Sequence, residues 1–373
     1  MLKLTPGDYT DTLKRCYKTK DGLLLLGPPG IGKSEIPRQV FKSVAEAKGK
    51  EFVYWDKTDK SEKQELFAEP EKYFVFCDQR LSQMDTTDLR GIPKMDAEML
   101  DSMPPMWVMY FTQEKADGLI FFDEINLATP IVVGSAYQII HDRSIADRKI
   151  SDSVLMIAAG NRPEDKAFTF DLPLPLRDRF CEAELVPSLE SWTPWATKNK
   201  VNPHLISFVN WKESYLYRVS ETGADKSTTP RGIVRASRML GSMNITDAKA
   251  TMYVSLAVGE AFATEFQAYV KYFQELDWNT IFTNPKSVKS FETSKLFAVA
   301  GGLGEIFMKD YKRFDDVVSV VQHLPEEFSI MTLRLMKDGQ ANSFKRRAEK
   351  SKLFKTVLGP KLGKFIIDTD SLK

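Results

Sequence analysis

The clearest chemistry in this chain lies in a glycine-rich turn that follows a run of four leucines. Residues 23–34, LLLLGPPGIGKS, match the phosphate-binding pattern G-x-x-x-x-G-K-[ST] at every fixed position. Glycines allow backbone angles that turn successive N–H groups inward, and the following helix adds its positive N-terminal end. An ordinary glycine turn is the alternative. We expect a nucleoside triphosphate to bind at Gly27, Pro28, Pro29, Gly30, Ile31, Gly32, Lys33 and Ser34.

Two side chains of this loop and two carboxylates further along the chain are expected to have separate roles in binding and hydrolysing the nucleotide. Lys33 supplies a point charge for the outer phosphates, and the hydroxyl of Ser34 offers an oxygen to Mg²⁺. The apolar segment LIFFDE ends in Asp123 and Glu124. We expect Asp123 to hold Mg²⁺ through its water shell and Glu124 to polarise the water that attacks the γ-phosphate. Ser34 and Asp123 are therefore the predicted metal ligands.

Three further polar residues follow the last predicted strands. Asn161 closes the strand VLMIAAGN, where its amide is suited to hold the attacking water or a γ-phosphate oxygen. Capping of a turn is the alternative role for this residue. Arg177 and Arg179 in PLPLRDRF are suited to stabilise phosphoryl charge, from a neighbouring copy if required. Their alternative is surface pairing with acids such as Asp178.

These side chains meet only if a parallel sheet carries them to one edge. Near-continuous apolar strands alternate with helical connections, which indicates an α/β domain with a sheet covered on both faces. A helix is predicted after the loop, ending near Gly49, and the charged stretch 57–72 is expected to be an exposed insertion. The domain is expected over residues 1–188. Its five predicted parallel strands lie at 23–26, 73–78, 119–124, 154–161 and 181–186.

Beyond residue 188 the pattern becomes helical. We expect a helical domain over residues 189–275 and a helical region with a basic end over residues 276–373. Glycine breaks are expected in the second region at Gly301, Gly302 and Gly304. The helical runs of the first region are 203–217, 229–241 and a long one at 248–273.

Composition limits the other possibilities. The 373 residues are 43% hydrophobic and 28% charged, as in soluble globular proteins, and they contain neither a membrane-length apolar run nor the apolar core of a signal peptide. We therefore expect a cytoplasmic protein. Three cysteines without a C-x-x-C pair indicate no disulfide framework and no thiolate zinc site, and three isolated histidines indicate no H-E-x-x-H site. Any metal is expected to arrive with the nucleotide. These residues are Cys16, Cys77, Cys181, His141, His204 and His323.

The formal net charge of +1 gives no overall attraction to nucleic acid. One segment, residues 343–364, is rich in Lys and Arg with only Glu349 opposing them. It is suited to phosphates or an acidic partner, and a solvated helix face is its simpler interpretation.

The order of these motifs resembles that of the AAA+ ATPases, and most closely their MoxR-type branch, over residues 13–273. DLRGIP at 88–93 stands where that branch has its DL-x-G segment, and 143–150 resembles its hairpin before the sensor 1 residue. The resemblance implies a P-loop AAA+ domain, an α-helical lid and a helical C-terminal region. It implies that Asn161 is sensor 1, that Arg179 is the arginine finger with Arg177 in reserve, and that Arg231 of TTPRG is the sensor 2 arginine.

The same resemblance implies a function. MoxR-type proteins form ATP-hydrolysing hexameric rings, act as chaperone-like motors on protein clients, and often pair with a separate von Willebrand factor A domain protein. ATP rather than GTP is implied by the family, and the chain also lacks an N-K-x-D base-reading motif. The predicted catalytic set is Glu124, Asn161, Arg177, Arg179 and Arg231, with ATP and Mg²⁺ as cofactors. A nucleic-acid motor and a nucleotide switch without turnover are the alternatives.

Overall fold

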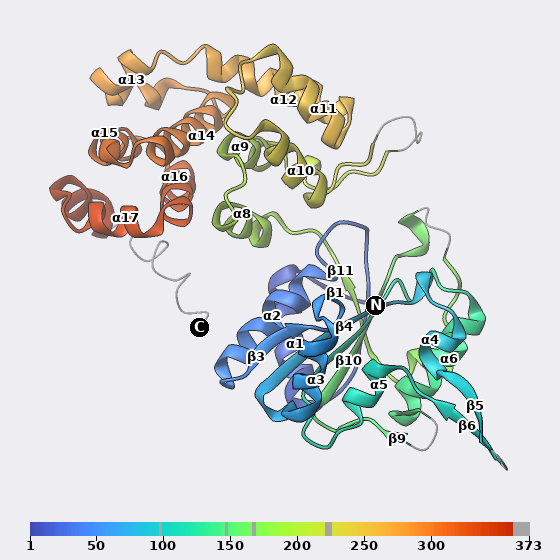
Figure 1. Ribbon diagram of the computed structural model, residues 1–373. Helices are drawn as coiled ribbons and strands as arrows, with labels where there is room; N and C mark the ends of the chain where they lie inside the picture. The colour runs from blue at the N-terminus through green and yellow to red at the C-terminus, as the bar shows by residue number, and fades with distance from the viewer. Residues whose placement is uncertain (97–98, 146–147, 166–168, 221–225, 361–373) are drawn as a thin grey trace. The chain divides into compact units, whose positions relative to one another are not determined.

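The computed structural model describes residues 1–96, 99–145, 148–165, 169–220 and 226–360. The chain divides into two compact units, Met1–Val186 and Pro187–Lys373 (Figure 1). The first unit contains a parallel sheet with helices, and the described part of the second is helical. Within the described ranges, none of the helices has the length and apolar character that crossing a bilayer requires.

The first unit is built on a sheet of seven parallel strands in the order β1-β11-β2-β10-β7-β4-β3. The predicted α/β class and parallel sheet are confirmed, and all five predicted strands are present. The predicted number of five strands is wrong because two edge strands extend the sheet. The strands are β1 (Leu2–Leu4), β2 (Leu23–Leu26), β3 (Glu51–Tyr54), β4 (Tyr73–Arg80), β7 (Gly118–Asp123), β10 (Val154–Gly160) and β11 (Cys181–Leu185).

The two strands that the sequence pattern did not reveal are the outermost ones. β1 has three residues and buries one of them, and β3 buries none of its four residues fully. The inner strands β7 and β10 are buried along their whole length. Continuous apolar runs therefore mark the strands with two covered faces, whereas an edge strand leaves a weaker signal.

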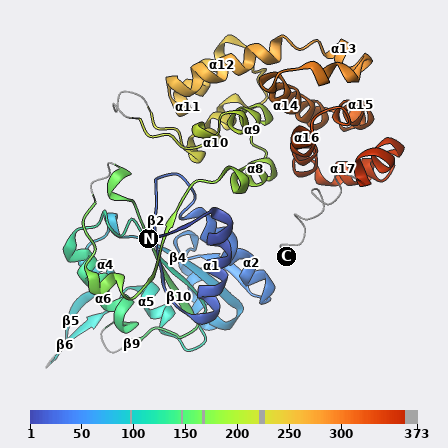
Figure 2. The ribbon, with the colours of Figure 1, turned by 180° about the vertical axis from the view of Figure 1, so that it is seen from behind.

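Helices cover both faces of this sheet. They are α1 (Pro6–Thr19), α2 (Glu35–Ala47), α3 (Lys60–Ala68), α4 (Thr86–Arg90), α5 (Met106–Phe111), α6 (Pro130–Asp142) and α7 (Leu174–Arg177). α1 and α2 lie side by side (Figures 1 and 2), and Phe41 of α2 stacks on Phe74 of β4 with ring centroids 5.7 Å apart. On the other face, Ile120 and Phe122 of β7 share a buried cluster with α5 and α6.

Local sequence fixes where α1 begins. Thr5 is its N-cap and accepts a hydrogen bond from the Asp8 N–H, while the Asp8 carboxylate accepts one from the Thr5 N–H. Pro6 follows in the first helical turn, where its missing N–H costs nothing. The buried residues of this helix recur at helical spacing, which pins it to the sheet: Tyr9, Leu13, Cys16 and Tyr17.

Two antiparallel hairpins and one additional helix interrupt the alternation of strands and helices. β5 (Ile92–Asp96) pairs with β6 (Met99–Met103), and β8 (Ser144–Ile145) pairs with β9 (Arg148–Lys149). The second pair confirms the hairpin predicted at 143–150. The stretch 57–72 is more than the exposed insertion we expected, because α3 lies within it and buries Leu66.

The second unit has one hydrophobic core, which runs from Trp192 to Leu358. The division at residue 275 stays a prediction. Its helices are α8 (Leu189–Lys198), α9 (Pro203–Trp211), α10 (Pro230–Leu240), α11 (Ala248–Val258), α12 (Glu260–Gln274), α13 (Trp278–Thr283), α14 (Thr293–Lys309), α15 (Phe314–Val321), α16 (Glu326–Gly339) and α17 (Ala341–Ala348).

Glycine positions in this unit differ from our expectations. The predicted long helix at 248–273 is wrong, because Gly259 adopts a φ of 95° and separates α11 from α12. The predicted breaks in α14 are also wrong, since that helix runs through all three glycines. A Cβ on Gly301 would lie 2.6 Å from the hydroxyl of Tyr269, so this glycine serves close packing within an unbroken helix.

Candidate functional site

The phosphate loop connects β2 to α2 at the carboxyl edge of the sheet. Gly30 and Gly32 have φ angles of 77° and 106°, in the left-handed region that favours glycine. A Cβ on Gly27 would lie 2.8 Å from the carbonyl oxygen of Leu185 on the neighbouring strand β11. The motif glycines are thus required by backbone conformation and by close strand packing.

Lys33 occupies the inside of the loop. Its side chain is largely buried, and Nζ donates to the carbonyl oxygens of Gly27 at 2.5 Å and Pro28 at 3.0 Å. Nζ also donates to Oδ1 of Asn161 at 3.0 Å. The structure therefore joins two predicted site residues that lie 128 positions apart in the sequence.

Tyr9 of α1 holds the phosphate loop through a hydrogen bond to its backbone, a role that sequence reasoning missed. Its hydroxyl donates to the carbonyl oxygen of Lys33 at 3.3 Å. Burial, with a smaller contribution from the Asp123 charge, raises the pKa of Tyr9 well above its ordinary value. The tyrosine thus keeps its proton and remains a donor to the loop.

Ser34 and Asp123, the predicted metal ligands, lie in direct contact. The Ser34 hydroxyl donates to Oδ2 of Asp123 at 2.7 Å, and Oδ1 of the same carboxylate accepts from the Glu124 N–H at 2.9 Å. Mg²⁺ is usually held by one or two protein oxygens together with waters and substrate phosphates. A hydroxyl and a carboxylate beside a phosphate loop fit that donor set. The described residues contain no group of three His, Cys, Asp or Glu side chains that could hold a metal without the nucleotide.

Glu124 stands at the point where β7 ends. Its φ of 56° lies in the left-handed region, which is uncommon for a residue with a Cβ. Its carboxylate accepts a hydrogen bond from the hydroxyl of Ser82, in the turn after β4. No sequence pattern pointed to this partner, because Ser82 lies 42 positions earlier in a segment without a motif.

Asn126 also contacts a predicted site residue, and sequence reasoning missed it as well. Its side-chain amide makes two hydrogen bonds with the backbone of Asn161. Its place two residues after Glu124, in the DEIN segment, was the available signal. The structure therefore groups five of the predicted polar residues at one edge of the sheet: Lys33, Ser34, Asp123, Glu124 and Asn161.

The two candidate arginines take other partners. Arg177 donates from Nε and Nη2 to the two carboxylate oxygens of Glu182, at 2.6 and 2.7 Å, which raises the pKa of this guanidinium. Arg179 is exposed and donates to Nε2 of His141 at 2.5 Å. Since that nitrogen accepts, the imidazole carries its proton on Nδ1, which faces the Asp142 carboxylate.

Arg231 belongs to the second unit. It is exposed and follows Pro230 in the first turn of α10, whose N-cap Thr229 accepts from the Gly232 N–H at 3.1 Å. The cap and the proline fix where this helix begins, and thereby the position of the arginine on it.

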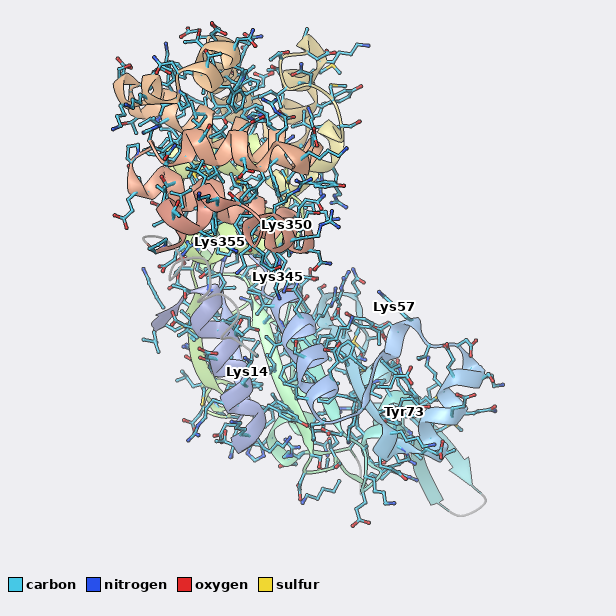
Figure 3. All side chains as sticks on the ribbon, turned by 90° about the vertical axis from the view of Figure 1, so that its left-hand side faces the viewer. Lys14, Lys57, Tyr73, Lys345, Lys350 and Lys355 are labelled. Atoms are coloured by element: carbon cyan, nitrogen blue, oxygen red, sulfur yellow. The ribbon has the colours of Figure 1, made fainter. Side chains whose placement is uncertain are left out.

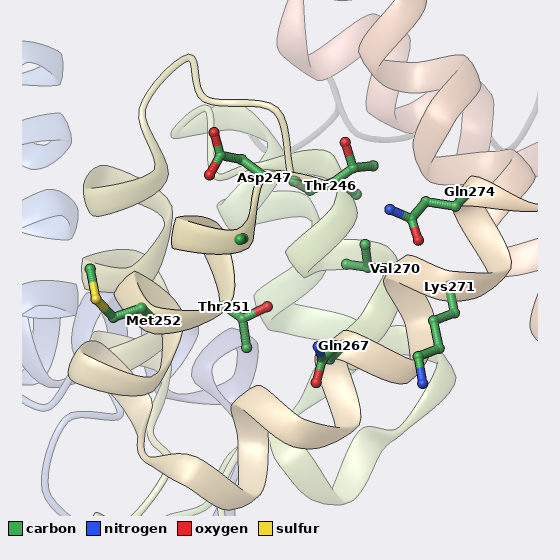
Figure 4. Close-up of a pocket in the computed structure, with 10 residues that line it drawn as sticks. Thr246, Asp247, Thr251, Met252, Gln267, Val270, Lys271 and Gln274 are labelled. Carbon is green, nitrogen blue, oxygen red and sulfur yellow. The ribbon is translucent and has the colours of Figure 1, made fainter.

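A separate groove lies between α11 and α12 in the second unit (Figure 4). It encloses about 360 Å³ and contains none of the predicted site residues. Its lining consists of Ile245, Thr246, Asp247, Ala248, Thr251, Met252, Gln267, Val270, Lys271 and Gln274.

A parallel sheet that places a phosphate-loop motif and two strand-end carboxylates at one edge defines a P-loop domain. Residues 22–180 match the family model described as AAA domain (dynein-related subfamily). The first unit therefore contains an AAA domain. The match covers less than half of the chain. It includes Arg177 and Arg179 but not Arg231.

No curated protein sequence matches the chain. Solved structures with similarity include the RuvB Holliday junction branch migration motor of Thermotoga maritima, at 17% identity and a TM-score of 0.30, covering 76% of this chain and 75% of that one. NtrX from Brucella abortus in complex with ATP has 12% identity and a TM-score of 0.36, covering 83% and 65%. The Aeropyrum pernix ORC2 protein has 12% identity and a TM-score of 0.37, covering 91% and 94%.

Proposed function

We propose that the chain is an ATPase whose pocket is completed by an adjoining copy, and that it acts as a MoxR-type remodelling motor on a protein partner. One observation carries the proposal. Lys33 bonds Asn161 and Ser34 bonds Asp123, so residues from the loop and from two strand ends converge on one point. This is the arrangement that phosphoryl transfer to water needs, since catalysis there is mainly positioning and charge stabilisation.

Each residue of the group has a distinct task in this proposal. The loop N–H groups and Lys33 bind the phosphates, and Ser34 with Asp123 holds Mg²⁺. When bound, Mg²⁺ neutralises charge on the phosphate oxygens. Glu124 orients and polarises the attacking water, and the amide of Asn161 holds that water or a γ-phosphate oxygen. Arg231 acts as sensor 2 by resemblance to the family.

The contacts of the two arginines favour Arg179 as the residue that crosses to an adjoining copy. Arg177 would have to leave a bidentate pair with the Glu182 carboxylate, whereas Arg179 would leave only a neutral imidazole. Charge-assisted bidentate pairs are the stronger interactions. If a neighbour supplies the guanidinium, assembly becomes part of the mechanism, and a hexameric ring is the form that the resemblance favours.

A protein client fits the MoxR-type resemblance. Loss of the γ-phosphate would release the contacts of Asn161 and of the arginine finger together, and would move the inserted loops at 91–107. The partner in this proposal is a separate chain, such as a von Willebrand factor A domain protein.

Three variants test the ATPase and its shared pocket. Lys33→Ala should abolish nucleotide binding, whereas Glu124→Gln should bind ATP with unchanged affinity and release no phosphate. Arg179→Ala should keep its affinity and lose rate, and mixing it with Lys33→Ala subunits should restore activity. Equal turnover in Glu124→Gln and the wild type would remove the water-activating role. Nucleotide-dependent assembly of a wild type that releases no phosphate would favour the switch without turnover.

The second candidate function, a nucleic-acid motor, rests on the basic segment of the second unit. Figure 3 labels Lys345, Lys350 and Lys355, which lie in α17 and the residues just after it. Changing all three to Ala should reduce the slope of log affinity for duplex DNA against log salt by about 2–3 if this segment contacts phosphates. An unchanged slope would remove this function. The matched control changes three exposed lysines of the first unit: Lys18, Lys42 and Lys60.

A further inference from the structure

The side chain of Asn126 extends the pairing of β7 with β10 beyond the point where β7 ends. The paired registers of the two strands run to Phe122 opposite Ala158. Glu124 then adopts a left-handed φ, and one further main-chain bond to β10 follows, from the Ile125 N–H to the carbonyl oxygen of Ala159 at 3.0 Å. Past this turn, the amide of Asn126 takes the place of a main-chain peptide group and pairs with the other strand.

Both halves of the amide are used in this pairing. Oδ1 of Asn126 accepts from the N–H of Asn161 at 3.0 Å, and Nδ2 donates to the carbonyl oxygen of Asn161 at 2.7 Å. Asn126 is 4% exposed, so water does not readily replace these bonds. One side chain therefore satisfies both backbone groups of Asn161, the residue that directly follows β10.

The neighbouring glycine shows how closely the amide approaches the strand. A Cβ added at Gly160 would lie 2.5 Å from Oδ1 of Asn126, a distance that no real side chain tolerates. Only glycine at this position lets the amide reach the backbone of Asn161. The glycine of the AAGN segment is thus required by a side chain in the turn after β7.

The backbone that Asn126 holds belongs to the residue whose side chain meets the phosphate loop, through the bond from Lys33 to Oδ1 of Asn161. We propose that Asn126 is a positioning residue, which fixes the backbone of Asn161 and thereby aims its amide at the site of the γ-phosphate. This inference rests on the proposed ATPase function. In this proposal Asn126 acts through Asn161 and does not bind the nucleotide itself.

The competing explanation is that Asn126 only stabilises the fold. A main-chain contact of the same residue helps to distinguish this role from the positioning of Asn161. The carbonyl oxygen of Asn126 accepts from the Phe170 N–H at 2.8 Å, a contact that every substitution of the side chain retains. A change at residue 126 therefore removes the amide bonds while this main-chain contact to Phe170 remains. Ser135 provides the matched control, because it is a buried polar residue of α6 whose hydroxyl donates only to the backbone of its own helix.

A double-mutant cycle tests the inference. Two lost hydrogen bonds should lower kcat of Asn126→Ala by about tenfold to about a hundredfold, with nucleotide affinity unchanged. In the Asn161→Ala background the same change should have less than about a twofold effect, since its target is already gone. Ser135→Ala should leave kcat unchanged. The same loss of kcat in both backgrounds, or no loss in either, would overturn the inference.

A second variant, Asn126→Asp, and a second measurement, hydrogen exchange, test the inference independently of Asn126→Ala. Asn126→Asp preserves size and, when protonated, restores both bonds, so its kcat relative to the wild type should rise as the pH falls. Hydrogen exchange at the Asn161 N–H should accelerate in Asn126→Ala and not in Ser135→Ala. If the wild type releases no phosphate, the proposed function fails, yet unchanged exchange at Asn161 would still overturn the inference and faster exchange would support it.

Discussion

Replacing Asp117 should destabilise the first unit more than replacing any exposed acid. Asp117 is 1% exposed and precedes β7, at the end of that strand opposite to Asp123. Its carboxylate accepts hydrogen bonds from the Tyr17 hydroxyl at 2.6 Å and from the ammonium group of Lys48 at 2.6 Å, and pairs with that of Lys50 at 2.9 Å. It therefore ties α1, the end of α2 and the start of β3 to one point.

The expected loss of stability depends on how well the lysines that lose the Asp117 carboxylate are solvated. Removing one partner of a buried ion pair costs about 3–5 kcal/mol when the other charge stays buried. The Lys48 side chain is 42% exposed and regains water, whereas that of Lys50 is 17% exposed. We therefore expect Asp117→Ala to cost about 3 kcal/mol, toward the lower end of that range. At about 2–4 °C per kcal/mol, the midpoint of thermal unfolding should fall by about 6–12 °C.

Thermal unfolding followed by circular dichroism measures this loss, with Asp152→Ala as the control. Asp152 pairs with Lys149 at the surface, with a side chain that is 79% exposed, and its removal should change the unfolding free energy far less than the removal of Asp117. Nucleotide affinity should be unchanged in both variants. A loss for Asp117→Ala no larger than that of the control would refute the reasoning.

The effect of Asp117 should also depend on pH. Burial opposes its ionisation, but the hydrogen bonds from Lys48, Tyr17 and Lys50 outweigh burial and lower the pKa of this carboxyl below its ordinary value of 3.8. A group with a lower pKa in the folded state stabilises the fold above its unfolded pKa and loses that contribution as the pH falls. The difference between the wild type and Asp117→Ala should stay constant near neutral pH and shrink below pH 3.8.

Three further predictions concern single contacts. Ser82→Ala should free the Glu124 carboxylate and raise kcat about two- to fivefold in a phosphate-release assay, and a lower kcat would contradict this. Gly301→Ala should destabilise the fold by about 1–3 kcal/mol through overpacking in urea unfolding, whereas Gly134→Ala, with open space around it, should stabilise it by about 0.5–1 kcal/mol. Burial opposes ionisation of Glu305, but hydrogen bonds from two basic neighbours hold its pKa at about 2. Glu305→Gln should therefore lower the unfolding midpoint at pH 7, and the difference should vanish as the pH approaches 2.

The parts of the fold that could be predicted from sequence are those in which a local pattern determines the structure. β7 is buried on both faces and reads as a continuous apolar run, and the phosphate loop contains every fixed residue of its motif. β3 escaped prediction because an edge strand needs no continuous apolar run. The glycines of α14 were mistaken for breaks because their function is to let Tyr269 and other distant side chains approach the helix.

The same distinction applies to the candidate site. Lys33 and Asp123 were found because each stands next to a strand end that the pattern reveals, and parallel strands bring such ends to one edge. Ser82 and Asn126 were missed because their roles depend on partners 42 and 35 positions away. Site residues that stand next to a predicted strand end could therefore be found from the sequence. The residues that hydrogen-bond to them from distant parts of the chain could be found only in the three-dimensional structure.

The left-handed backbone of Glu124 has a consequence for evolution and engineering. In that conformation the Cβ of a residue other than glycine destabilises the folded state by about 1–2 kcal/mol, and glycine has no such strain. Selection for robustness alone would therefore replace the residue that the proposed chemistry needs most. A glycine at this turn should therefore stabilise the fold and at the same time remove the carboxylate on which the proposed hydrolysis depends.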